Sequence, residues 1–97
     1  MALRVDIGTM VASAPGIKSG APHLAGTGVT VRSVARWHQA GLMPEEIVLK
    51  FSGVKLEQVH AALAYYFANQ QEIDADIRDQ EAKADEIEER AARHLRR

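Results

Sequence analysis

The chain has 97 residues, a formal net charge of −1 and no cysteine. This length favours one domain, with at most an appendage, and the missing cysteines exclude disulfide bonds and thiolate chemistry. No apolar run approaches the roughly 20 residues that span a membrane. The first ten residues include Arg4 and Asp6 and lack the apolar segment of a signal peptide. We therefore expect a cytoplasmic protein that has no membrane partner.

The charge is unevenly distributed along the chain. Residues 1–68 carry a net charge of +2, and residues 69–97 carry −3. A mildly basic body followed by an acidic segment suggests two different partners. We expect three units: a β-rich segment over residues 1–29, a helical body over residues 30–68, and a charged helical arm over residues 69–97.

Residues 1–29 contain few helix signals and several turn residues, such as Pro15 and Gly16. We expect one or two short strands here, near Met10–Ala14 and Pro22–Leu24. A two-stranded ribbon is marginally stable by itself. It should therefore pack on the helices or pair with another chain.

Hydrophobic periodicity predicts three short helices in the body, at Val31–Ala40, Pro44–Phe51 and Leu56–Ala68. Thr30 is placed to cap the first helix. The short turn between the last two helices has the spacing of a helix-turn-helix. The expected fold is therefore mainly α, a three-helix helix-turn-helix with a short N-terminal β-ribbon and an extended C-terminal helix.

The same periodicity assigns faces to the helices. The predicted buried face of the first helix contains Val31, Val34, Ala35 and His38, with Trp37 beside it, and its outer face contains Arg32, Arg36 and Gln39. The predicted inner stripe of the third helix contains Val59, Ala62, Leu63, Tyr66 and Phe67, and its outer face contains Glu57, Gln58, His60, Ala61 and Ala64.

A new helix is predicted to start at Asn69, where Asn69 and Glu72 match a capping box. The arm has a narrow stripe at alternating intervals of four and three, formed by Ile73, Ile77, Gln80, Ala84, Ile87, Ala91 and Leu95. Ion pairs between residues i and i+4 are expected at Asp74–Arg78, Asp79–Lys83, Glu86–Arg90 and Glu89–Arg93. Isoleucines at such positions gain nothing in water, so we expect the arm to dock on a partner rather than to fray in solvent.

Two sets of residues are candidates for binding. For DNA, phosphates would be held by Arg32, Arg36, Lys50 and Lys55, and base edges would be read by Gln58 and His60. For a protein partner, the arm would use Ile73, Ile77, Ile87 and Leu95, together with Asp74 and Asp76. A plain three-helix scaffold with solvated charges explains the first pattern about as well, since helical hairpins with short turns are common.

The sequence shows no motif for catalysis, metal binding or phosphate binding. No two of the four histidines lie three or four residues apart, and no metal-binding motif is present. The Gly26-Thr27-Gly28 run is too short to be a phosphate-binding loop and is better explained as a turn before a helix. We expect no catalytic residue, metal, cofactor or small-molecule substrate.

Three segments resemble the bacterial "domain of unknown function 433" family. Residues Gly20–Val31 (GAPHLAGTGVTV) resemble its signature G-x-P-x-x-x-G-T-R-I-x-V, and Gly41–Ile47 (GLMPEEI) resemble its G-x-S-x-E-E-I. Leu56–Tyr66 resemble its third helix, so the likeness extends over about residues 10–75. The resemblance implies a homeodomain-like helix-turn-helix behind a β-ribbon.

The resemblance also implies the antitoxin role of a type II toxin–antitoxin pair. The body would bind operator DNA as a dimer, and the arm would block a PIN-like ribonuclease toxin. The sequence departs from the family pattern at Gly28, where the family has Arg, and at Met43 and Lys55, where a capping Ser or Thr is typical. Each missing cap predicts a loss of helix stability of about 1 kcal/mol at most.

A second hypothesis from another class remains open. The chain would be a homo-oligomeric interaction module without a DNA role, whose arm pairs with the arm of its own copy. The weak positive charge of the body and the missing arginine at position 28 favour this alternative.

Overall fold

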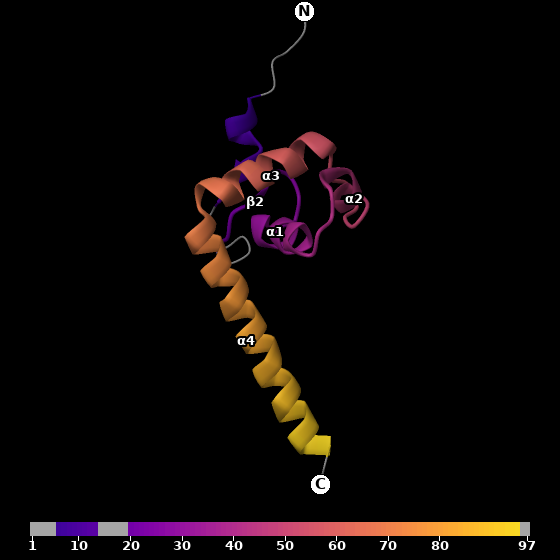
Figure 1. Ribbon diagram of the computed structural model, residues 1–97, viewed down its shortest axis with the longest axis vertical. Helices are drawn as coiled ribbons and strands as arrows, with labels where there is room; N and C mark the ends of the chain where they lie inside the picture. Colours follow the sequence, from indigo (N-terminus) through magenta and orange to yellow (C-terminus); the bar gives the residue numbers. More distant parts are fainter. Residues whose placement is uncertain (1–5, 14–19, 96–97) are drawn as a thin grey trace, which may run out of the picture.

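The computed structural model describes residues 6–13 and 20–95, which fold into a small helical body with one projecting helix (Figure 1). The elements in chain order are a 3-10 helix η1 at Ile7–Thr9, the strands β1 at Val11–Ala12 and β2 at His23–Leu24, and the helices α1 at Val31–Gln39, α2 at Pro44–Val48, α3 at Leu56–Ala68 and α4 at Gln70–Leu95. The protein is thus mainly helical with a small two-stranded sheet, as the sequence predicts. The turn predicted at Pro15-Gly16 and the ends of the chain, residues 1–5 and 96–97, lie outside the described residues.

The two strands form an antiparallel ribbon in which Val11 pairs with Leu24 and Ala12 with His23. Of the two alternatives for this ribbon, packing on the helices is the one observed. Leu24 is fully buried in the common core, with Val11 packed against that core. Because β2 leads through a tight turn directly into α1, the ribbon also fixes where α1 begins.

Helix α1 has the caps that its sequence predicts. The Thr30 hydroxyl accepts a hydrogen bond from the Ser33 N–H at 3.1 Å. At the other end, Gly41 has a φ of 97°, and the Leu42 N–H donates to the Trp37 carbonyl at 3.2 Å. The positive φ of Gly41 and the bond from Leu42 belong to a Schellman motif, which needs a residue in the left-handed region after the helix. Both ends of α1 are therefore set by local sequence.

The predicted second helix is too long, because α2 already ends at Val48. The next turn tightens into i→i+3 hydrogen bonds, such as Lys50 N–H to the Ile47 carbonyl at 2.9 Å. Helices α2 and α3 begin without a side-chain cap at Met43 and Lys55. Instead, the third residue of each helix reaches back: the Glu46 carboxylate accepts from the Met43 N–H, and the Gln58 amide oxygen accepts from the Lys55 N–H, both at 2.9 Å.

The observed bounds of α3 agree with the predicted ones, but two residues change face. Ala61, predicted to face outward, is buried, and Phe67, predicted to face inward, is 54% exposed. Helix α3 lies across α1, α2 and the ribbon (Figure 1). Contacts from several sides bury more of its circumference than a single amphipathic stripe allows for. Phe67 escapes burial because it lies near the end of the helix, where its ring contacts the ring of His38 edge-on at 5.3 Å between centroids.

The chain breaks at Asn69, as predicted, between α3 and α4. The Asn69 side chain donates to the Tyr65 carbonyl at 3.0 Å, so it closes α3 instead of forming the predicted capping box of α4. The first turns of α4 pack on α1, and the rest of the helix extends away from the body (Figure 1). The molecule is consequently elongated, with extents of 67 × 29 × 25 Å.

Candidate functional site

The root of α4 is joined to the body by a polar network. Asp74 accepts a hydrogen bond from the Tyr66 hydroxyl at 2.7 Å and another from the Gln39 amide at 3.0 Å. Asp76 accepts from Arg32 of α1 at 2.7 Å. The hydrogen bond that Tyr66 donates to Asp74, together with burial, raises the pKa of Tyr66 above its ordinary value of 10.0. The Tyr66 side chain is therefore neutral in this polar network.

Four of the predicted partner-binding residues are engaged by the chain itself. Ile73 and Ile77 are buried in the common core, 2% and 4% exposed, so the expectation that they await a partner is corrected. Asp74 and Asp76 form the root network with α1 and α3. The periodic stripe indicates that these isoleucines need an apolar neighbour, but it does not tell which one. Here that neighbour is the body of the same molecule.

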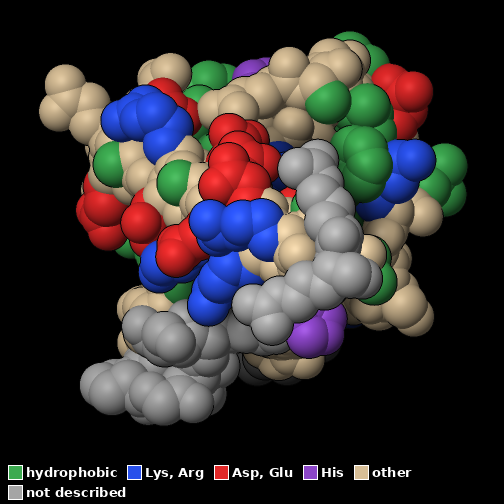
Figure 2. Space-filling model, turned by 90° about the horizontal axis from the view of Figure 1, so that it is seen from below, with side chains coloured by type: hydrophobic (Ala, Val, Ile, Leu, Met, Phe, Trp, Pro, Cys, Tyr) green, Lys and Arg blue, Asp and Glu red, His purple; other side chains and the backbone are tan. Residues whose placement is uncertain are grey.

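The outer part of α4 has no such contacts. Residues 81–95, which we call the free arm, are all exposed. Ile87 and Leu95, the two other predicted partner residues, are 58% and 81% exposed. Of the four predicted i, i+4 ion pairs, Asp79–Lys83 is formed at 3.1 Å. In the view from below, acidic and basic side chains alternate across the middle of the face (Figure 2).

The exposed side of α3 does not carry the charges of a DNA-recognition helix. Its exposed positions after the first residue are Glu57, His60, Ala64, Phe67 and Ala68. Gln58, predicted to read bases, donates its amide N–H to the Ala25 carbonyl at 3.3 Å while its oxygen caps α3. Of the two predicted base-reading residues, His60 is exposed and Gln58 is half-buried and used by the fold.

The predicted phosphate-binding residues differ in availability. Arg32 is half-buried in its ion pair with Asp76, so its predicted place on a solvated outer face is corrected. Arg36, Lys50 and Lys55 are exposed. The Lys50 ammonium lies 4.8 Å from the centre of the Trp37 ring, which is a cation–π distance. The available cations therefore surround α1 and the α2–α3 turn rather than the face of α3.

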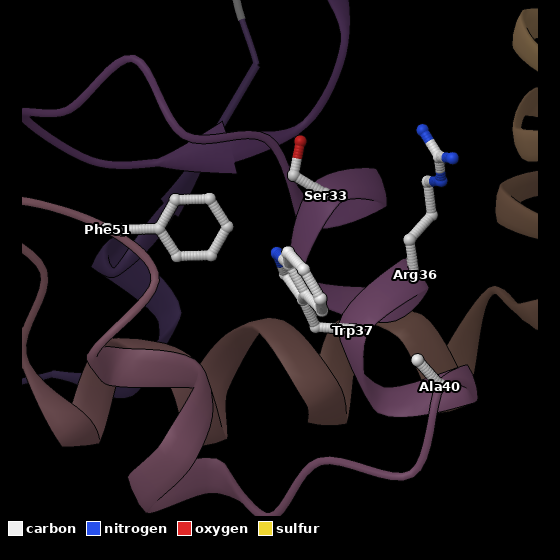
Figure 3. A pocket seen from close by; sticks show the side chains of 5 residues that line it. All are labelled: Ser33, Arg36, Trp37, Ala40 and Phe51. Carbon is white, nitrogen blue, oxygen red and sulfur yellow. The ribbon is translucent and has the colours of Figure 1, made fainter.

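A cleft lies beside these cations, with a volume of about 370 Å³. We call it the Trp37 cleft; it is lined by Ser33, Arg36, Trp37, Ala40 and Phe51 (Figure 3). The sequence did not single out the two ring residues of the cleft, exposed Trp37 and half-buried Phe51. A signal was present, because Ser33, Arg36 and Trp37 of α1 and its C-cap residue Ala40 recur at i, i+3, i+4 and i+7 and so mark a further face of that helix.

Within residues 6–13 and 20–95, no three His, Asp or Glu side chains come together in a way that would hold a metal ion. None of the helices described for this chain combines the length and apolarity needed to cross a bilayer.

Comparison with known proteins gives the family. The family described as "Protein of unknown function (DUF433)" matches residues 11–66, more than half of the chain. The chain belongs to the DUF433 family. A solved structure, that of a DUF433 member from Anabaena variabilis ATCC 29413, has 26% sequence identity and a TM-score of 0.66, over 71% of this chain and 68% of that one. No curated protein matches the chain.

The DUF433 signature segment has a clear structural task here. Gly20 and Gly26 have φ values of 80° and 76°, which non-glycine residues rarely adopt. Thr27 donates to the Leu24 carbonyl at 2.8 Å and accepts from the Val29 N–H at 3.1 Å, which holds the turn between β2 and α1. Gly28, where the resemblance leads one to expect an arginine, is exposed on this turn. The segment thus joins the ribbon to α1.

Proposed function

We propose that this DUF433 protein is the antitoxin of a type II pair and that its free arm, residues 81–95, neutralises a PIN-like ribonuclease. The observation that carries the proposal is the contrast within α4. Its first turns are anchored by buried Ile73 and Ile77, whereas Ile87 and Leu95 are exposed. An anchored root gives the arm a defined direction, which lowers the ordering cost of docking it on a partner.

The charge of the free arm supports a basic partner. Residues 81–89 carry five carboxylates and one lysine. A ribonuclease needs cations around its active site to hold RNA phosphates, and a row of carboxylates competes for such cations. Ile87, on the stripe among these carboxylates, would supply apolar contact in a groove. In this arrangement the arm excludes RNA both sterically and electrostatically.

The proposal includes operator binding by the body as a homodimer. Its support is the exposed group Arg36, Lys50 and Lys55, which could contact phosphates from α1 and the α2–α3 turn, with His60 toward the bases. The homeodomain-like helix-turn-helix is part of the same proposal. The neutral-to-acidic exposed side of α3 requires that most of this affinity come from the phosphate backbone.

The decisive experiment looks for a PIN-like ribonuclease in the neighbouring reading frame and measures RNA cleavage by it. Added full-length chain should suppress cleavage, and Ile87→Glu should weaken the inhibition at least about tenfold, since it places a charge in the apolar contact. Ala92→Glu is the matched control, because it adds the same charge to another face of the same exposed helix and should inhibit nearly as well as the parent. Equal inhibition by both variants would refute the assignment of the arm.

The homo-oligomer alternative predicts a different result. In that case Ile87→Glu would convert a dimer of the chain alone into a monomer in analytical ultracentrifugation, with no ribonuclease present. Operator binding is tested separately with duplex DNA from the upstream region. A phosphate-dominated complex should weaken steeply with salt, and the Lys50→Ala, Lys55→Ala double variant should flatten that dependence by about two units of slope.

A further inference from the structure

The Trp37 cleft has two aromatic rings that neither the arm nor the operator hypothesis uses, beside the cations Arg36 and Lys50 that the operator hypothesis also invokes. The rings of Trp37 on α1 and Phe51 on the α2–α3 turn face the same space from two different elements (Figure 3). Trp37, the only tryptophan of the chain, is 37% exposed. The volume of about 370 Å³ lies near the lower end of the range of small-ligand sites. The cleft is thus large enough for one flat ring and its substituents.

Two cations flank the rings. Arg36 lines the cleft, and the Lys50 ammonium lies 4.8 Å from the Trp37 ring centre. The ion pairs found within the described residues involve Arg32 and Lys83, and neither Arg36 nor Lys50 belongs to them. Arg32, one turn earlier on the same helix, differs from Arg36 because it is paired with Asp76. Within the described residues, neither Arg36 nor Lys50 is held by a carboxylate; Arg36 lines the cleft, and Lys50, which already contacts the Trp37 ring, lies at its border.

A ligand that satisfies both features must combine a flat aromatic ring with a negative charge. A nucleotide has this chemistry: the base stacks on aromatic rings, and a guanidinium binds phosphate through paired N–H donors. An aliphatic anion would leave the rings unused, and a base inside a duplex is stacked on its neighbours and cannot enter a cleft. A nucleotide that binds here must therefore present an unstacked base.

We propose that the Trp37 cleft binds a nucleotide, with its base against Trp37 and Phe51 and its phosphate on Arg36 and Lys50. The nucleotide is either free or part of a single strand, since the recognised chemistry is the same. This goes beyond the proposed antitoxin function, in which the arm binds protein and the body binds duplex DNA.

The test uses the fluorescence of Trp37 in the full-length chain without any ribonuclease. Uridine monophosphate and an oligouridine of about ten nucleotides are titrated separately, and stacking should quench the emission with saturation. Quenching by both assigns a free-nucleotide site, and quenching by the oligonucleotide alone assigns a single-strand site. Quenching by neither overturns the proposal, as does tighter binding of a duplex than of the single strand.

Variants separate recognition from folding. Arg36→Gln should weaken binding of the fluorescently labelled oligouridine at least about fivefold, whereas Arg78→Gln, the same change at an exposed position of α4, should not. Phe51→Leu keeps an apolar side chain and removes only the stacking ring, so it should weaken binding about five- to a hundredfold. Circular dichroism checks that each variant is folded. Equal affinities of the Arg36 and Arg78 variants, or an unchanged affinity of a folded Phe51→Leu, would refute the site.

Discussion

Arg32 on α1 and Asp76 on α4 lie 44 positions apart in the chain, and their Nη1 and Oδ2 atoms are 2.7 Å apart. Their side chains are 23% and 33% exposed, so the pair is only partly screened by solvent. The pair orients the root of the free arm. The ion pair therefore holds α4 on the body together with the buried Ile73 and Ile77.

The first prediction concerns that ion pair. A double-mutant cycle with Arg32→Gln and Asp76→Asn should give a coupling free energy of about 1 kcal/mol, since the pair is half-buried and hydrogen-bonded. The exposed pair Asp79–Lys83, whose side chains are 59% and 62% exposed respectively, is the control and should give less than about 0.5 kcal/mol. Urea denaturation of the four variants in each cycle measures both values. Equal coupling in the two cycles would contradict a special role of Arg32–Asp76.

The second prediction separates the two halves of the isoleucine stripe. Ile73→Ala should lower the free energy of unfolding by about 2–5 kcal/mol, because it leaves a cavity in the core. Ile87→Ala should change it by less than about 0.5 kcal/mol, because this side chain is 58% exposed. Thermal and urea unfolding of the isolated chain provide the measurement. A large loss for Ile87→Ala in the isolated chain would mean that this residue already has a partner, as in a self-paired arm.

The third prediction is a dependence on alkaline pH. The pKa of Tyr66 is raised in the folded state, first by the hydrogen bond to Asp74 and then by burial. A raised folded pKa means that the unfolded chain loses this proton first. The corresponding stability is fully present below the ordinary pKa of 10.0 and declines as the pH rises through the raised value.

Ultraviolet titration of the phenolates measures this effect. The folded chain should show a late tyrosine ionisation that is missing in Tyr66→Phe. In denaturant, where Asp74 is no longer near, the late step should move to the ordinary value. A late step that persists in Tyr66→Phe would assign it to another group.

The fourth prediction concerns the incomplete cap of α2. Met43→Ser should raise the free energy of unfolding by about 1 kcal/mol, because serine offers an acceptor to an N–H of the first turn that the methionine side chain does not. Glu46→Ala should lower it, because the Glu46 carboxylate accepts from the Met43 N–H. Combining both changes tests whether the two halves of the capping box act together. If Met43→Ser does not raise the free energy of unfolding, the hydrogen bond between the Met43 N–H and Glu46 is by itself a sufficient cap for α2.

Much of the local structure follows from the sequence alone. The bounds of α3, the caps of α1 at Thr30 and Gly41, the break at Asn69 and the ribbon before the helices are all predicted from neighbouring residues. These features depend on interactions within a few positions, such as a side-chain oxygen reaching an N–H three residues away. Such interactions are present in the sequence as spacing, so reading the sequence recovers them.

Tertiary structure decided what each face contacts. The stripe along α4 indicates that Ile73, Ile77 and Ile87 share one side, but periodicity contains no information on whether that side meets the same chain, a second copy or another protein. The body reaches only the first turns, so Ile73 and Ile77 are buried while Ile87 remains exposed. Likewise Arg32 and Arg36 look equivalent on a helical projection, yet α4 brings a carboxylate to Arg32. Because partners distant in sequence meet only through the folded arrangement of helices, these assignments required the three-dimensional structure.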